Sequence, residues 1–221
     1  MKKEFIEFMV DSGVLTFGDF VTKSGRNTPY FVNTGNYKTA SQIAKLGEFY
    51  AAAVAEHFGA EDFVLFGPAY KGIPLVVTTS VALCNKHNLN PCYCFNRKEA
   101  KDHGEGGSIV GAKLKDGDNI VIIEDVITAG TAIRECLPIL KSAANVNIKG
   151  LVISVDRMEK GQSNRTAIQE IKEEFGIDTY PIVTVRNIID TLHNNPIDGK
   201  IIIDDTMKEK MEQYLNQYCI N

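Results

Sequence analysis

Two acids and a run of small residues stand together in the segment IVIIEDVITAGTAIRECL, residues 120–137. The apolar run predicts a buried strand, and Glu124 and Asp125 stand at its carboxyl end, ahead of a helical pattern. Adjacent carboxylates accept hydrogen bonds from vicinal hydroxyls, and a helix N-terminus offers free N–H groups to phosphate. The segment therefore predicts a pocket for a ribose that carries one phosphate.

The loop between strand and helix contains Thr128, Ala129, Gly130 and Thr131. Glycine lets the backbone curl closely around an anion, and the threonine hydroxyls donate further hydrogen bonds. For the loop taken alone, an ordinary capped helix start with solvated acids is equally acceptable. The chain has no GxxxxGK[ST], and no GxGxxG follows any strand, which disfavours a P-loop hydrolase and a dinucleotide site.

The elements that position this loop form a βαβ rhythm. The expected strands are 62–67, 91–95, 119–126, 148–156 and 179–185, and the expected helices are 40–58, 73–85, 132–143, 163–175 and 207–218. The strand segments are apolar at consecutive positions, which suits strands covered on both faces. We therefore predict a doubly wound α/β fold, with a mostly parallel central sheet flanked by helices.

The remaining segments suggest one domain, residues 1–221, with a small cap contributed by residues 1–38. Residues 14–33 mix short β-like runs with the turn SGRNTP. The polar, glycine-bearing stretch 97–107 predicts a long loop, and 108–119 predicts a strand and a hairpin turn. No internal repeat divides the chain.

Composition excludes several classes of partner. The net charge of −4 provides no overall positive field for nucleic acid, and no apolar run reaches the length of a membrane span. Five irregularly spaced cysteines and a start without a hydrophobic signal segment favour a reducing cytoplasm. Cys92 and Cys94 lack a partner pair, so we expect buried thiols there instead of zinc ligands.

EDVITAGTA resembles the 5-phosphoribosyl 1-diphosphate motif of the type I phosphoribosyltransferases, and VITAGTAIRE is similar to the orotate branch of that family. The likeness extends over nearly the whole chain. It implies that Glu124 and Asp125 hold the ribose 2- and 3-hydroxyls, while residues 127–132 surround the 5-phosphate. The residues that it assigns to the sugar diphosphate are Lys23, Tyr70, Lys71, Arg97, Lys98, Lys101, His103, Glu124, Asp125, Val126, Ile127, Thr128, Ala129, Gly130, Thr131 and Ala132.

The resemblance implies transfer of the 5-phosphoribosyl group to orotate, giving orotidine 5-monophosphate and diphosphate in de novo pyrimidine biosynthesis. It implies Lys101, His103 and Asp125 as catalytic residues, and Mg²⁺ bound mainly through the substrate's diphosphate and ribose. Two alternatives remain open at this point. One is a purine phosphoribosyltransferase, and the other is a regulatory nucleic-acid-binding protein of the same fold.

Two further segments resemble the family's diphosphate contacts. FGPAYKGIPL, residues 66–75, places Tyr70 and Lys71 in a turn where the resemblance implies a strained peptide, such as a non-proline cis bond. RKEAKDHGEGG, residues 97–107, is similar to the mobile catalytic loop, which would act across a homodimer in the neighbouring site. Without the family, a solvated surface loop is the preferred interpretation of this segment.

Base recognition depends most heavily on the resemblance. VTKSGRNTPYFVNTG, residues 21–35, is similar to the orotate branch's N-terminal motif and implies contacts from Lys23, Phe31 and Val32. Some members have a second phenylalanine in place of Val32. Thr128, and Arg157 of SVDRMEKG, complete the implied orotate set, because a planar guanidinium suits a carboxylate or ring carbonyls. Without the family, SGRNTP is a turn, Phe31 a core residue and Arg157 a surface charge.

Overall fold

The computed structural model describes residues 1–22, 25–101, 107–127, 130–161 and 163–220, and within them six strands form a central sheet in the order β5-β4-β3-β6-β7-β8. The strands are β3 (Val64–Gly67), β4 (Cys92–Lys101), β5 (Gly107–Gly111), β6 (Asn119–Ile123), β7 (Asn147–Asp156) and β8 (Thr179–Thr184). All neighbours are parallel except β4 and β5, which are antiparallel. The predicted mostly parallel sheet is confirmed.

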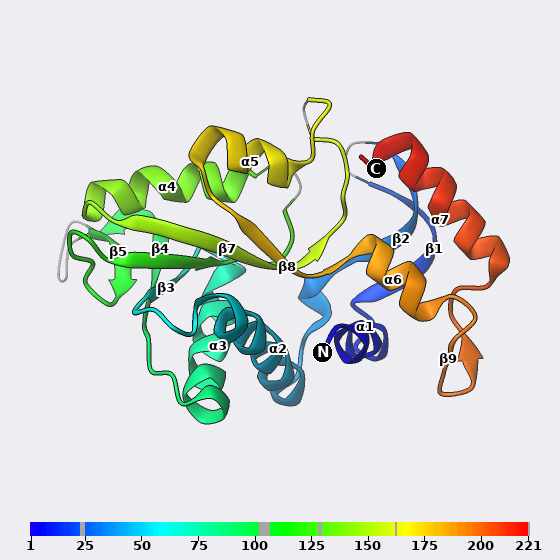
Figure 1. The fold of residues 1–221 in the computed structure, drawn as a ribbon, viewed down its shortest axis with the longest axis horizontal. Coiled ribbons are helices and arrows are strands. Elements are labelled where there is room, and N and C mark those ends of the chain that lie inside the picture. The colour runs from blue at the N-terminus through cyan, green and yellow to red at the C-terminus, as the bar shows by residue number, and fades with distance from the viewer. Residues whose placement is uncertain (23–24, 102–106, 128–129, 162, 221) are drawn as a thin grey trace.

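Helices cover both faces of this sheet (Figure 1). α2 (Ala40–Phe58) and α3 (Gly72–His87) lie on one face, and α4 (Thr131–Ala143) and α5 (Ala167–Phe175) lie on the other. Successive residues of β6 enter two different cores: Ile120 and Ile122 pack on the α4 side, and Val121 and Ile123 on the opposite side. All four are fully buried. This alternation explains why the strand is apolar at every position, as the doubly wound prediction required.

Local capping signals fix the helix on which the site partly rests. Thr39 accepts a hydrogen bond from the Gln42 N–H at 3.2 Å, and the Gln42 side chain accepts one from the Thr39 N–H at 3.1 Å. This reciprocal capping box satisfies two of the free N–H groups at the start of α2. The helix spans the predicted residues and ends before Gly59.

The strand order reverses direction between β3 and β6. From β3 the chain passes through α3 to β4 on one side, whereas β6 continues through α4 to β7 on the other side. α3 and α4 lie on opposite faces of the sheet (Figure 1). The loops that follow β3 and β6 therefore diverge at the carboxyl edge, where open α/β sheets bind ligands.

Beyond this edge lies a separate hairpin of β1 (Leu15–Val21) and β2 (Asn27–Val32), next to the C-terminal helix α7 (Asp205–Tyr218) (Figure 1). The rings of Tyr30 on β2 and Tyr214 on α7 meet edge to face, with centroids 5.9 Å apart. The two ends of the chain thus meet in one layer. The division of the chain into a domain and a cap at residue 38 stays a prediction.

Two expectations need correction. Residues 97–101 continue β4 as a strand, with Lys101 opposite Gly107 of β5, although their charge and glycine neighbours suggested a loop. Pairing with β5 supplies the hydrogen bonds that local composition does not reveal. Cys92 is exposed while Cys94 is buried, as alternation along a strand requires.

The elements that the sequence patterns did not separate are α1 (Lys2–Asp11), the short 3₁₀ helix η1 (Thr34–Asn36), α6 (Val185–Leu192) and a small hairpin of β9 (Pro196–Ile197) and β10 (Lys200–Ile201). α6 follows β8 without a loop, so its apolar residues merge with those of the strand in the sequence. None of the helices in the described ranges is both long and apolar enough to cross a membrane.

Candidate active site

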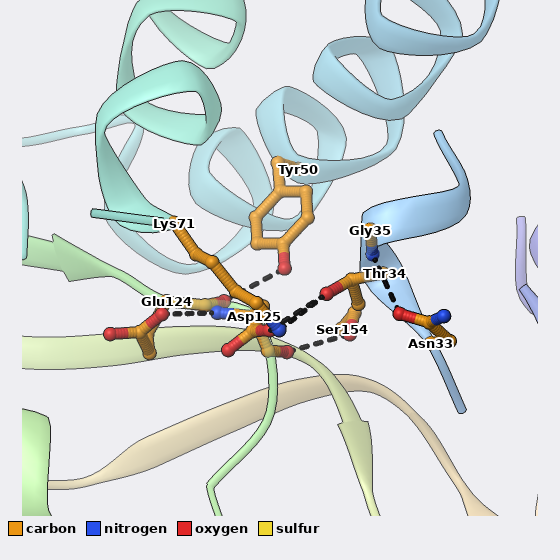
Figure 2. Close-up of polar contacts among 8 residues, drawn as sticks. All are labelled: Asn33, Thr34, Gly35, Tyr50, Lys71, Glu124, Asp125 and Ser154. Atoms are coloured by element: carbon orange, nitrogen blue, oxygen red, sulfur yellow. Dashed lines mark hydrogen bonds and ion pairs between the residues drawn. The ribbon is translucent and has the colours of Figure 1, made fainter. Parts of the chain in front are cut away.

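The main chain of Glu124 and Asp125, directly after β6, is held from both sides (Figure 2). The Tyr50 hydroxyl of α2 donates to the Glu124 carbonyl at 2.8 Å. Ser154 of β7 donates its hydroxyl at 2.6 Å and its N–H at 2.9 Å to the Asp125 carbonyl. Because Tyr50 and Ser154 are themselves buried, the two acids have fixed positions at the end of the strand.

The Asp125 carboxylate has a cationic partner. Its Oδ2 accepts hydrogen bonds from Lys71 Nζ and from the Thr34 hydroxyl, each at 2.8 Å. Burial favours a raised pKa, but the hydrogen bonds from Lys71, the Val126 N–H and Thr34 outweigh it and hold the pKa of Asp125 below its ordinary value. Asp125 is therefore ionised at neutral pH.

Glu124 has the opposite protonation. Its side chain is only 6% exposed, and burial, reinforced by the charge of Asp125, raises the pKa of Glu124 to about 8. Its Oε1 accepts the N–H of Asp125 at 2.9 Å. At pH 7 the unliganded site therefore presents a protonated carboxyl beside an ionised one, so that one acid donates and the other accepts.

The loop after the acids ends on a glycine with a left-handed backbone, a conformation that favours glycine. Gly130 has φ +69° and stands at the N-cap of α4, which begins at Thr131. Because glycine has no side chain, the first-turn N–H groups of α4 receive no side-chain cap from it and stay available to an anion. Thr128 and Ala129, to which the sequence also assigned phosphate contacts, lie outside the described residues.

A hollow of about 320 Å³ joins the loops after β3 and β6. Its lining contains many of the predicted sugar diphosphate contacts. These are Tyr70, Lys71, Glu124, Asp125, Val126, Ile127, Gly130, Thr131 and Ala132. Ala69 and Ile133 complete the lining. The structure thus brings together two segments that lie some fifty residues apart in the chain, and it does so at the strand-order reversal.

The turn after β3 contains the peptide that the resemblance implied, because the bond between Ala69 and Tyr70 is cis. The Ala69 N–H donates to the buried side chain of Asn96 at 2.8 Å. Tyr70 itself is 67% exposed, and Lys98 Nζ lies 5.6 Å from its ring centroid. Lys71 of this turn and Arg97 and Lys98 of β4 therefore form a group of cations beside the hollow, which we call the cationic rim.

The predicted catalytic loop is only partly described. Arg97 and Lys98 lie on β4, and Arg97 is half-buried while Lys98 is exposed. Lys101 ends this strand, and nothing is described of its side chain. His103 lies outside the described residues. The catalytic roles of Lys101 and His103 therefore stay predictions.

On the base side, Arg157 follows β7 and is buried, with only 9% of its surface exposed, instead of lying on the surface. Its guanidinium carbon lies 4.7 Å from the centroid of Tyr30. Tyr30 stands between Thr28 and Val32 in the alternation of β2, so Val32 shares the face that meets Arg157. Phe31 packs against Phe20 with ring centroids 5.7 Å apart.

Phe31 is 37% exposed, so the interpretation as a plain core residue is wrong. Its contact with a base stays a prediction, as does that of Lys23, which lies outside the described residues.

Sequence patterns did not single out several residues that shape the site. They are Thr34, Tyr50, Asn96 and Ser154, together with Glu159 and Tyr214 near Arg157. Except for Glu159, which stands two residues after Arg157, each comes from an element other than the one it supports, so no local spacing marks it. Only the hydroxyl that follows β2 in VNTG offered a weak signal, because small polar residues at strand ends commonly face ligands.

The fold and the acid-bearing loop define a class of protein. The family described as "Phosphoribosyl transferase domain" matches residues 33–182, from the end of β2 almost to the end of β8. This range holds the acids, the glycine-bearing loop, the turn after β3 and Arg157.

Relatives specify the branch. The Clostridium beijerinckii protein named orotate phosphoribosyltransferase is 59% identical over 217 residues, which cover 98% of this chain and 97% of that protein. The Clostridium acetobutylicum protein of the same name is 56% identical, with coverages of 99% and 98%. The crystal structure of orotate phosphoribosyltransferase from Francisella tularensis is 38% identical, with a TM-score of 0.85, and the match covers 98% of this chain and 100% of that one. The chain belongs to the orotate phosphoribosyltransferase family of enzymes.

Proposed function

We propose that the chain transfers the 5-phosphoribosyl group of 5-phosphoribosyl 1-diphosphate to orotate, forming orotidine 5-monophosphate and diphosphate in pyrimidine biosynthesis. The observation that carries this proposal is the hollow that Glu124 and Asp125 line together with Tyr70, Lys71 and the left-handed Gly130 at the start of α4. That arrangement suits a ribose phosphate, and the close relatives bear the orotate name.

The sugar would lie across the hollow at the strand-order reversal. Asp125 accepts a hydrogen bond from one ribose hydroxyl, and Glu124 donates a hydrogen bond to the adjacent ribose hydroxyl or accepts one from it. The first turn of α4, with Thr131 and Ala132, supplies N–H groups to the 5-phosphate, and Val126 and Ile127 line the same hollow. Since Tyr50 and Ser154 hold the acid main chain, the ribose is oriented by groups that do not rearrange at the moment of reaction.

The diphosphate would leave toward the cationic rim. Tyr70, Lys71, Arg97 and Lys98 face or adjoin that side of the hollow, and Lys101 and His103 would join them from the segment after β4. As the bond at the anomeric carbon breaks, positive character develops on the ribose and negative charge on the leaving group. The rim stabilises the second charge, and Lys101 or His103 supplies a proton to the departing oxygen.

The base would be held by Lys23, Phe31, Val32, Thr128 and Arg157. Val32 lies on the same face of β2 as Tyr30, and the guanidinium of Arg157 lies over the Tyr30 ring. A guanidinium of this kind recognises a flat anion through paired N–H groups. Orotate carries both a carboxylate and ring carbonyls, so it offers suitable acceptors.

Mg²⁺ fits this site as a partner of the substrate. Among the described residues no group of three or more His, Cys, Asp or Glu side chains forms a metal cage, and Asp125 already has a lysine partner. Mg²⁺ commonly takes one or two carboxylates and fills its remaining positions with substrate phosphates and water. When bound, it neutralises charge on the diphosphate. Glu124 and Asp125 are the side chains placed to support it through the ribose hydroxyls.

We further propose a cytoplasmic homodimer in which the loop of residues 97–103 reaches into the neighbouring site. Arg97 and Lys98 adjoin their own subunit's hollow, so Lys101 and His103 are the residues of this loop that would act in the other subunit. Mixing a Lys101→Ala variant with an Asp125→Asn variant tests this directly, because a hybrid dimer would contain one site with both residues intact. Activity above that of either variant alone is expected. No recovery after subunit exchange, verified with differently tagged chains, would place the segment in its own subunit's site.

The activity is tested by following orotate absorbance with the sugar diphosphate and Mg²⁺. Orotate loss that requires both is the expected result. A panel of adenine, guanine, hypoxanthine and uracil in the same assay distinguishes a purine enzyme, which would consume a purine in preference. Filter binding of RNA and DNA at physiological salt distinguishes a regulatory protein, for which tight binding without turnover would be observed.

A further inference from the structure

Arg157 belongs to a cluster of four side chains that we call the arginine cluster: Tyr30, Arg157, Glu159 and Tyr214. Arg157 Nε donates to Glu159 Oε1 at 2.8 Å, and Nη2 lies 2.6 Å from the same oxygen. The Tyr214 hydroxyl donates to this oxygen as well, at 2.6 Å. One carboxylate oxygen of Glu159 therefore joins the arginine to the C-terminal helix.

The aromatic rings of this cluster complete the enclosure. Tyr30 covers one face of the guanidinium, with the guanidinium carbon 4.7 Å from the ring centroid. Tyr214 meets Tyr30 edge to face at 5.9 Å. A guanidinium between a ring and a carboxylate loses most of its rotational freedom, because rotation would break the in-plane bond to Glu159 or the stacking on Tyr30.

The main chain around the cluster is also tied to the C-terminal segment. The Lys160 N–H donates to the Tyr218 carbonyl at 2.8 Å, and the Ile220 N–H donates to the Met158 carbonyl at 3.2 Å. Met158 has a left-handed backbone with φ +56°, which turns the chain sharply after Arg157. The turn that carries Arg157 is thus paired with the residues that follow α7.

Part of the guanidinium is left for a ligand. Nε and Nη2 both face Glu159 Oε1, at 2.8 and 2.6 Å. A planar guanidinium carries five N–H donors, and one carboxylate oxygen does not occupy all of them. Glu159 takes the Nε side of the planar fork, so the donors on the remaining side are those that an incoming acceptor meets.

We infer that Glu159 and Tyr214 are positioning residues that act through Arg157: they hold its guanidinium in the orientation that receives the anionic base. This inference rests on the proposed function, in which Arg157 contacts orotate. Tyr214 reaches the base only through two intervening groups. Its loss should therefore affect recognition of orotate and leave the handling of the sugar diphosphate unchanged.

The test is Tyr214→Phe, which keeps the ring against Tyr30 and removes the hydroxyl bonded to Glu159. We expect kcat/KM for orotate to fall about 5- to 20-fold through KM, since one hydrogen bond to a charged group is lost. The KM for the sugar diphosphate and kcat should stay within about twofold. Glu159→Gln should act in the same direction. Tyr218→Phe is the matched control, because it removes another tyrosine hydroxyl from α7 while Tyr214 keeps its hydrogen bond to Glu159.

Coupling to Arg157 separates positioning from simple stabilisation. In an Arg157→Lys background, which keeps the charge but removes the planar fork, Tyr214→Phe should cause no further loss of kcat/KM for orotate. Equal effects of Tyr214→Phe in both backgrounds would overturn the inference. So would unchanged orotate kinetics, or equal rises in both KM values together with a lowered melting temperature.

Failure of the underlying proposal has a different signature. If the parent chain consumes no orotate, the proposed activity fails. If Arg157→Lys alone leaves the KM for orotate unchanged, the assigned contact of Arg157 fails. Either result is visible before Tyr214→Phe is made.

Discussion

The acid pair after β6 and Arg157 after β7 lie at the ends of neighbouring parallel strands, yet different parts of the chain hold them in place. Glu124, Asp125 and Gly130 lie within one stretch of seven residues, and buried residues of the adjoining sheet and helix fix the main chain of the two acids. Arg157 depends on β2 near one end of the chain and on α7 near the other. The sugar side of the site is a local feature of the sheet edge, whereas the base side is a tertiary assembly.

Because different parts of the chain hold the two sides, we expect mutations of each side to change a different kinetic property. A change to the sugar side should alter turnover with any base, because every base meets the same activated ribose. A change to the arginine cluster should alter discrimination among bases.

The largest expected effect comes from Lys101, in the predicted catalytic loop that would serve the sugar side. Lys101→Ala should lower turnover by roughly 10²–10³, by analogy with removal of one contact to transition-state charge, and should leave the fold intact. Steady-state rates with saturating substrates and a circular dichroism spectrum check both points. Lys113→Ala, an exposed lysine just after β5, is the control. Near-normal turnover would refute the role of Lys101.

Asp125→Asn is expected to follow in size. The amide still accepts from Thr34, but it loses the ion pair with Lys71 and the charged acceptor for a ribose hydroxyl. We expect kcat/KM for the sugar diphosphate to fall about 10- to 100-fold. Asp62→Asn, at the opposite end of the sheet, should have no effect. A loss confined to orotate kinetics would contradict the separation of the two sides.

Glu124 makes the sugar side sensitive to pH. Its folded-state pKa of about 8 exceeds the value of 4.5 expected when unfolded, so between these values the folded chain binds more protons than the unfolded chain. Its contribution to the free energy of unfolding is therefore greatest below pH 4.5, declines through this window and is fully lost above pH 8.

Glu124→Gln should remove this component and stabilise the protein at pH 9, relative to the parent, by roughly 1–4 kcal/mol. Urea unfolding at pH 5, 7 and 9 measures the effect, with Glu56→Gln on the exposed side of α2 as control. Parallel pH profiles for parent and variant would show that Glu124 titrates normally.

The smallest expected effect is at the glycine ahead of α4. In Gly130→Ala an alanine would have to adopt φ +69°. Its Cβ would lie 3.2 Å from Arg134 Nη1 and 3.2 Å from a side-chain carbon of Ile171. We expect a loss of about 1–2 kcal/mol in unfolding free energy and weaker binding of inorganic phosphate by calorimetry. Gly176→Ala has a similar φ of +72° in open space, so it should lose stability without losing phosphate. Equal phosphate affinities would remove the loop from the binding site.

Much of the sheet and the sugar side was predictable because their signals are local. β6 is apolar at each position since its residues alternate between two cores, and the acids and small residues follow it without interruption. The start of α2 is marked in the sequence by the capping box of Thr39 and Gln42. The cis bond before Tyr70 was implied by family likeness and is confirmed, although no residue spacing required it.

The base side was not predictable in this way. Nothing near Arg157 in the sequence indicates that Tyr30 covers it or that Tyr214 shares its carboxylate, because Tyr30 stands far earlier in the chain and Tyr214 stands 55 residues after Glu159. A charged residue after a strand is usually solvated, so burial of Arg157 depends on the folded arrangement of three elements. The extension of β4 through Lys101 could not be predicted for the same reason, because the partner strand of β4 is β5, where Gly107 lies opposite Lys101.

The ion pair between Lys71 and Asp125 also bears on how substrate enters. The carboxylate that awaits a sugar hydroxyl already has two donors, so binding is an exchange of partners instead of the filling of an empty acceptor. Lys71 is 63% exposed, whereas the Asp125 side chain is only 13% exposed, so the lysine is the partner that can turn away into solvent. The released ammonium stays on the side where the diphosphate arrives, so the same event that opens the acceptor frees a counter-ion for the leaving group.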